Sequence, residues 1–222
     1  MLSPPDTSWD FGSFVLYEPV TVLTDLLVTA VCWYAAHQLY KPGKDVLRNL
    51  FVWYFLMMGM ATAWGGILGH GFVVQLGFQW KMPGWFISMF AVALLERAAI
   101  FHAKPYLPKR WGSRLAVLNL VELTLLCIIV LLSQNFFFVE AHAFYGLMII
   151  VAGLEYYIYR NSKSRAALHM LFAVGIAALA ALVHLAEFSL HTWFNYLDLS
   201  HILMAVASYR FFIGAQKVLL EA

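Results

Sequence analysis

The chain has 222 residues, of which 63% are hydrophobic and only 12% are charged, and its net charge is +2. Soluble domains are about 45–50% apolar and about 25% charged, so this composition excludes a soluble enzyme, a disordered chain and a disulfide scaffold. The small net charge gives no sign of nucleic-acid binding, and we expect one integral membrane domain over residues 1–222.

Seven apolar stretches are long enough to cross roughly 30 Å of bilayer hydrocarbon as helices. In chain order they are residues 20–40, 50–73, 84–103, 115–136, 142–159, 166–188 and 199–217. Short polar, proline or glycine segments separate them, and Ser133-Gln134-Asn135 is the weakest of these boundaries. The sequence therefore predicts an all-α fold, a seven-transmembrane helix bundle.

Lysine and arginine are distributed unequally among the connections between spans. The first, third and fifth connections hold clusters of basic residues, whereas the other side of the membrane would hold Lys81 alone. Because basic loops stay in the cytoplasm, the N-terminus is predicted outside and the C-terminus inside a plasma membrane, such as the bacterial inner membrane. Residues 1–19 have no basic n-region, so we expect the first span to direct insertion without a cleaved signal peptide.

Ionisable side chains within spans are costly to bury and therefore indicate function. One set is predicted near the outer ends of the spans: Glu18, Asp25, His70, Glu140, His142, His184, Glu187, His191, Asp198 and His201. A second set is predicted deeper, toward the cytoplasm: Glu96, Arg97, Glu122, Glu155 and Arg210. Opposite charges at similar depth favour ion pairs between helices, so we interpret the second set as structural, with a proton or ion path as the alternative. In the first set, we interpret His142, His184 and His191 as side chains at the wet interface.

His70 and His201 are the candidates for a metal site in the first set. His70 is flanked by the glycines of Gly65-Gly66-Ile67-Leu68-Gly69-His70-Gly71, which allow neighbouring helices to approach closely. His201 follows Asp198 by three residues, so both side chains share one helical face. Histidine and carboxylate are common zinc ligands. The sequence therefore predicts a zinc site formed by His70 and His201 with Asp198 or Asp25, or both, as carboxylate ligands.

Three segments, Glu18–Asp25, Gly65–Phe72 and Asp198–Met204, look like those of uncharacterised bacterial seven-helix proteins. More remotely, the arrangement resembles the superfamily of alkaline ceramidases, progestin/adipoQ receptors and Per1-type proteins, which are seven-helix, zinc-dependent lipid amide hydrolases or their relatives. His70 and His201 match histidines in the second and seventh helices of that superfamily. Gly66 and Leu197 stand where it has a serine and another histidine, and Lys81 stands near the start of the third span in place of an aspartate.

The resemblance implies a membrane-embedded, metal-dependent hydrolase that acts on a lipid amide or ester at the outer leaflet. Metal-bound water would attack the carbonyl carbon, with Glu18 or Glu187 as the proton carrier. Two alternatives stay open: a non-enzymatic seven-helix protein that binds a lipid or another small ligand, and a b-type haem protein with His70 and either His184 or His201 as axial ligands. In each case membrane lipids are the expected partners.

Overall fold

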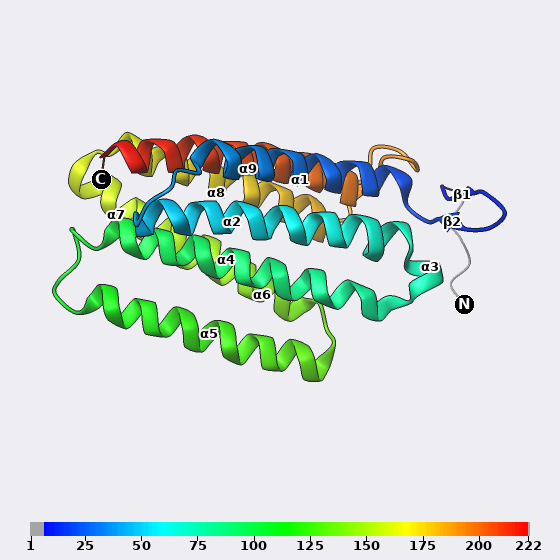
Figure 1. Ribbon diagram of the computed structural model, residues 1–222, viewed down its shortest axis with the longest axis horizontal. Helices are drawn as coiled ribbons and strands as arrows, with labels where there is room; N and C mark the ends of the chain where they lie inside the picture. The colour runs from blue at the N-terminus through cyan, green and yellow to red at the C-terminus, as the bar shows by residue number, and fades with distance from the viewer. Residues whose placement is uncertain (1–6, 222) are drawn as a thin grey trace.

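The computed structural model describes residues 7–221, and seven of its helical segments are long and apolar enough to cross a membrane (Figure 1). The seven predicted spans are therefore confirmed. Their bounds are Pro19–Leu39 (α1), Val46–Gly71, Phe78–Ala103, Trp111–Ser133 (α5), Phe137–Ser162, Arg165–Leu185 (α8) and Tyr196–Glu221 (α9).

Three of these spans are composite. The second joins α2 (Val46–Trp64) to a π-helix, η1 (Gly65–Gly71), and the third joins the 3-10 helix η2 (Phe78–Trp80) to α4 (Lys81–Ala103). The fifth consists of α6 (Phe137–Phe144), a second π-helix, η3 (Tyr145–Val151), and α7 (Ala152–Ser162). Outside the spans lie the short helix α3 (Val73–Leu76) and an antiparallel pair of strands, β1 (Trp9–Asp10) and β2 (Val15–Leu16), in which Trp9 pairs with Leu16.

Several spans begin earlier than predicted, and in α2 a capping residue is the reason. The Asp45 side chain accepts a hydrogen bond from the backbone N–H of Arg48 at 3.1 Å, so α2 begins at Val46. The Met82-Pro83-Gly84 segment, expected as a break, lies in the first turn of α4. Proline is tolerated there because the first N–H groups of a helix have no intrahelical partner.

The core of the bundle is formed by α1, α2, α4, α8 and α9. Within this core, α1 packs against α2 and α9, α8 packs against α9, and α4 packs against α2. Small residues allow the close helix contacts that drive packing in a membrane; a Cβ at Gly214 of α9 would lie only 2.6 Å from the Met170 sulfur of α8. In contrast, α5 lies at the edge of the bundle against α4 and α6 (Figure 1).

The two ends of the bundle differ in charge. The connections at residues 40–45, 104–110 and 163–164, which carry the basic clusters, meet at the end where α9 finishes (Figure 1). We call this the basic end. The opposite end, here called the N-terminal end, carries the β1–β2 hairpin, residues 72–80 and the connection from α8 to α9 (Figure 1). The connection from α5 to α6 stops short of the N-terminal end, which places the start of α6 deeper in the bundle than the start of α1 (Figure 1).

Candidate functional site

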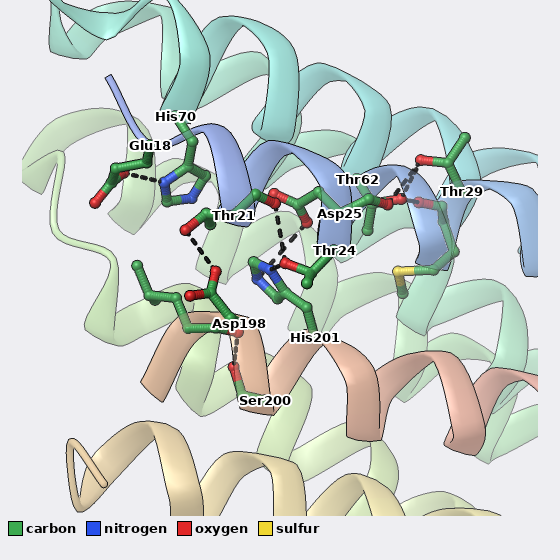
Figure 2. Close-up of polar contacts among 12 residues, drawn as sticks. Glu18, Thr21, Thr24, Asp25, Thr29, Thr62, His70, Asp198, Ser200 and His201 are labelled. Atoms are coloured by element: carbon green, nitrogen blue, oxygen red, sulfur yellow. Dashed lines mark hydrogen bonds and ion pairs between the residues drawn. The ribbon is translucent and has the colours of Figure 1, made fainter. Parts of the chain in front are cut away.

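Polar side chains from α1, η1 and α9 meet at the N-terminal end of the bundle (Figure 2). The segments are distant in sequence, but α1 packs directly against both η1 and α9. Because α1 begins at Pro19, its first two turns direct a row of polar side chains toward the other two segments. We call this group the His70 cluster, which consists of Glu18, Thr21, Thr24, Asp25, His70, Asp198 and His201.

The backbone around His70 is specialised. His70 lies in η1, and π-helical segments are rare and frequently occur at functional sites. Gly66, in the same segment, makes room for Asp25, because a Cβ at position 66 would lie 2.7 Å from the Asp25 Cβ. Gly66 therefore allows a carboxylate from α1 to lie beside the cluster.

His70 is held by Glu18. The Nδ1 atom of His70 lies 2.6 Å from a carboxylate oxygen of Glu18, and both side chains are mostly buried. Burial alone would raise the pKa of Glu18, but the hydrogen bond from His70 and the charges of His70 and Lys81 outweigh burial and lower this pKa below its usual 4.5. Since Nδ1 is occupied by Glu18, the Nε2 atom of His70 is the ring nitrogen left for a ligand.

His201 approaches both His70 and Asp25. The ring centroids of the two histidines are 6.2 Å apart, and His201 Nε2 lies 3.6 Å from an oxygen of Asp25. The other nitrogen, Nδ1, lies 3.3 Å from the hydroxyl of Thr24, and that hydroxyl also lies 3.1 Å from the Thr21 carbonyl oxygen, to which it donates. A hydroxyl that donates to this carbonyl accepts a hydrogen bond from His201 Nδ1–H, which leaves Nε2 bare and directed at Asp25.

These distances can be compared with the needs of a metal ion. Ligand bonds of about 2.0–2.2 Å in a tetrahedron separate two ligand atoms by about 3.4 Å, close to the 3.6 Å between His201 Nε2 and Asp25. The same geometry places two histidine centroids about 5 Å apart, so His70 would have to move inward by about 1 Å. In keeping with this, no three ligand atoms of the His70 cluster lie within 4.8 Å of one another in the described chain.

Asp198 has a different set of partners. One of its oxygens accepts a hydrogen bond from the Thr21 hydroxyl at 2.7 Å, and the other accepts from the backbone N–H of Asn195, also at 2.7 Å. The Asn195 side chain in turn accepts from the N–H of Leu197 at 2.8 Å. This is a reciprocal capping arrangement at the start of α9. Asp198 therefore joins α1 to α9 and fixes the first turn that carries His201.

Glu187, the other predicted proton carrier, lies outside the cluster. It is exposed in the connection after α8, in a left-handed conformation with φ of 50°. Within residues 7–221 its side chain makes no hydrogen bond or ion pair to either histidine of the His70 cluster. The nearby His184 pairs with Glu140 at 3.3 Å, and both side chains are about one third exposed. These two agree with an interfacial interpretation.

The predicted arginine–glutamate pairs among the deeper residues are wrong for the described chain. The carboxylates face histidines instead: Glu155 pairs with His102 at 3.0 Å, and Glu122 pairs with His142 at 2.9 Å. Arg97 donates to the side-chain oxygen of Asn119 at 3.0 Å. His142 was expected at the interface, but it is fully buried, and its ring lies between the Glu122 carboxylate and the carbonyl oxygen of Met89.

Sequence analysis also missed three threonines of α1, two of which belong to the His70 cluster. Thr21, Thr24 and Thr29 lie on the buried side of α1, and each donates its hydroxyl to a polar atom. Their helical spacing, together with Asp25, forms a polar stripe in an apolar span, which is the signal that could have identified them.

Two hollows accompany these side chains. A polar one of about 10 Å³, roughly the space of one water, is lined by residues that include Glu18, Thr21 and Asp198. An apolar cavity of about 190 Å³ lies among α2, α4, α6 and α9 and is lined mainly by hydrophobic side chains. Its wall includes His142 and also Met204, which follows His201 by one turn of α9.

Comparison with known proteins gives one match. A search of the curated proteins found no match, and neither did a search of the solved structures. Residues 20–220 match the model of a protein family described as a family of unknown function, DUF6962. This match covers the seven spans except their outermost residues, Pro19 and Glu221, and every member of the His70 cluster except Glu18, so the chain belongs to this family.

Proposed function

We propose that the protein is a membrane-embedded, metal-dependent hydrolase that acts on a lipid amide or ester. The observation that carries the proposal is the convergence of His70, His201 and Asp25 from three helical segments. Each histidine has one ring nitrogen occupied by a neighbouring side chain, Glu18 or Thr24. Such outer partners orient the imidazoles of metal sites and fix their tautomers.

Charge in the cluster favours a divalent cation. Three carboxylates, those of Glu18, Asp25 and Asp198, lie together, and the last two are almost fully buried. The basic side chain near them is Lys81, whose charge acts on Glu18. When all three carboxylates are ionised they outnumber the positive charges of His70 and Lys81, and the net negative charge is costly in a bundle surrounded by lipid unless a cation compensates it.

In the proposed site, His70, His201 and Asp25 hold Zn²⁺, and Glu18 and Thr24 keep the imidazoles oriented. Bound zinc supplies a Lewis acid and lowers the pKa of a coordinated water to about 7. Glu18 is the proton carrier, because its carboxylate borders the small polar hollow next to the cluster. We assign Asp198 a positioning role, since both of its oxygens already accept hydrogen bonds.

The apolar cavity supports a lipid substrate. Drug-sized ligands occupy pockets of about 300–1,000 Å³, so a cavity of about 190 Å³ has room for a segment of an acyl chain and not for a whole lipid. Met204 connects the cavity wall to the turn of α9 that carries His201. The same cavity favours the second candidate function, the binding of a lipid or other apolar ligand without chemistry.

The proposed membrane is a plasma membrane with the His70 cluster at its outer face. The basic connections all lie at the opposite end of the bundle (Figure 1), where they would face the cytoplasm. A haem group at His70 and His201 has less support, because His201 Nε2, the nitrogen left free, faces the Asp25 carboxylate at 3.6 Å.

The test is hydrolysis of fluorescent-acyl amide and ester lipids in mixed micelles by the purified protein. We expect release of the labelled fatty acid, loss of release after chelation, and recovery with Zn²⁺. His201→Ala should abolish release, while His37→Ala, an exposed histidine far along α1, should not. Binding of the labelled lipids without release by any zinc-loaded sample would support the ligand-binding function instead.

A further inference from the structure

A second group of potential metal ligands lies inside the bundle, apart from the His70 cluster. Glu96 of α4, Glu122 of α5 and His142 of α6 each offer a ligand atom, and these atoms all lie within 4.8 Å of one another. Among the described residues this is the one group of three such side chains that meets this criterion. We call it the Glu96 cluster.

Glu96 has no hydrogen-bond partner. It is fully buried, and it is the one carboxylate in residues 7–221 whose two oxygens are both buried and unpaired. The neighbouring Arg97 forms no ion pair with it, because its guanidinium donates to Asn119. An unpaired buried carboxylate is among the most costly groups in a protein interior, so Glu96 must be neutralised either by its own proton or by a bound cation.

The hydrogen bonds of His142 point to a cation at the same place. Its Nε2 atom lies 2.9 Å from the carbonyl oxygen of Met89, which can only accept, so Nε2 carries a proton. In the neutral imidazole, Nδ1 is then a bare lone pair, and it faces the carboxylate oxygens of Glu122 at 2.9 and 3.1 Å. Two acceptors at this distance require a cation between them, either a proton or a metal ion.

The backbone beside Glu96 is shaped for its carboxylate. Gly146 lies in the π-helix η3, and a Cβ at this position would lie 2.6 Å from a carboxylate oxygen of Glu96. Both candidate clusters thus adjoin a π-helical segment in which a glycine makes room for a carboxylate from a neighbouring helix. A carbonyl that accepts from the distal nitrogen of a histidine is, in addition, a common outer partner in metal sites.

We propose that the Glu96 cluster binds a divalent first-row cation through Glu96, Glu122 and Nδ1 of His142. One imidazole and two carboxylates suit Mn²⁺, Fe²⁺ or Zn²⁺. Binding would displace a proton from the His142–Glu122 pair and neutralise both carboxylates. It would also attach α5, which otherwise packs at the edge of the bundle, to α4 and α6.

The test is titration of the purified, metal-free protein with Mn²⁺ alone, followed by electron paramagnetic resonance. Each variant is made both in the wild-type chain and in the His70→Ala background. The second series excludes Mn²⁺ bound by the His70 cluster. We expect Glu96→Gln and Glu122→Gln to weaken one Mn²⁺ site by at least about tenfold. Glu155→Gln is the matched control, because Glu155 is an equally buried glutamate paired with a histidine outside the cluster.

Two glycine variants provide a second test of the proposal in case the glutamate variants misfold. Gly146→Ala should also weaken Mn²⁺ binding, whereas Gly153→Ala, one segment further along the same span, should not, because a Cβ there meets no atom within 4 Å. Mn²⁺ binding that is absent from the wild type, or equal in Glu96→Gln, Glu122→Gln and Glu155→Gln, would overturn the proposal. In that case the cation between His142 and Glu122 is a proton.

Discussion

At the scale of single residues, the geometry of the His70 cluster depends on neighbouring residues that are not themselves candidate ligands. Gly66 shows this most clearly. In the structure it is the residue that admits Asp25, because any side chain at position 66 would collide with the Asp25 Cβ.

We predict that Gly66→Ala destabilises the protein by about 1–3 kcal/mol, the usual cost of overpacking, and impairs metal binding by displacing Asp25. Gly65→Ala is the matched control, because a Cβ at position 65 meets no atom within 4 Å. Thermal unfolding in detergent micelles measures the difference. Equal midpoints for the two variants would show that Asp25 does not depend on this glycine.

Glu18 gives a prediction about pH. Its pKa is lowered below 4.5 in the folded protein, so the Glu18–His70 pair stabilises the fold at neutral pH, and this contribution is lost as the pH falls through the folded-state pKa. Glu18→Gln should therefore cost about 1–2 kcal/mol near neutral pH. The stability difference from the wild type should close well below pH 4.5. A difference that is independent of pH would contradict this assignment.

At the scale of helices, the site is built from ends and irregular segments. The two π-helices, η1 and η3, each bring a glycine against a carboxylate from a neighbouring helix. The first turn of α9 is fixed by the capping bonds between Asn195 and Asp198. The sequence could not predict the π-helices, since the insertion of a wider turn depends on packing with α1 and α4 and leaves no distinct local pattern.

Substitution of Asp198 distinguishes a positioning role of this residue from a role as a metal ligand. Asp198→Ala removes a capping interaction and the hydrogen bond from Thr21, so we predict a loss of stability of about 1–3 kcal/mol. Bound zinc per folded chain should stay unchanged, since Asp198 is not assigned as a ligand. Stability is followed by thermal unfolding and zinc by elemental analysis. A variant that folds normally but has lost its zinc would restore the sequence-based interpretation of Asp198 as a ligand.

At the scale of the whole molecule, hydropathy and length were sufficient to predict the seven spans, because each needs its own apolar stretch. The meeting of His70 and His201 was also expected, from their similar depth in the second and seventh spans and from the glycines that flank His70. The predicted depth of His142 was wrong. The connection from α5 to α6 stops short of the N-terminal end (Figure 1), and no sequence pattern in this connection indicates that. Pairing partners such as Glu155 and His102 depend on helix rotation, which periodicity alone does not fix in a span that is apolar all round.

The distribution of basic residues predicts the orientation of the bundle. A green fluorescent reporter fused after residue 222 should fluoresce, and an alkaline phosphatase fused there should be inactive, because the C-terminus is predicted in the cytoplasm. A phosphatase inserted into the connection from α8 to α9 should be active. The reverse pattern would place the His70 cluster at the cytoplasmic face.

The central claim is that His70, His201 and Asp25 hold a metal ion, and the zinc content of protein purified without chelators tests it most directly. The measurement is made in a Glu122→Gln background, so that the Glu96 cluster does not contribute. The account predicts about one zinc per chain, lost in His70→Ala and retained in His37→Ala. Equal zinc in these two variants, or none in the parent protein, would contradict it.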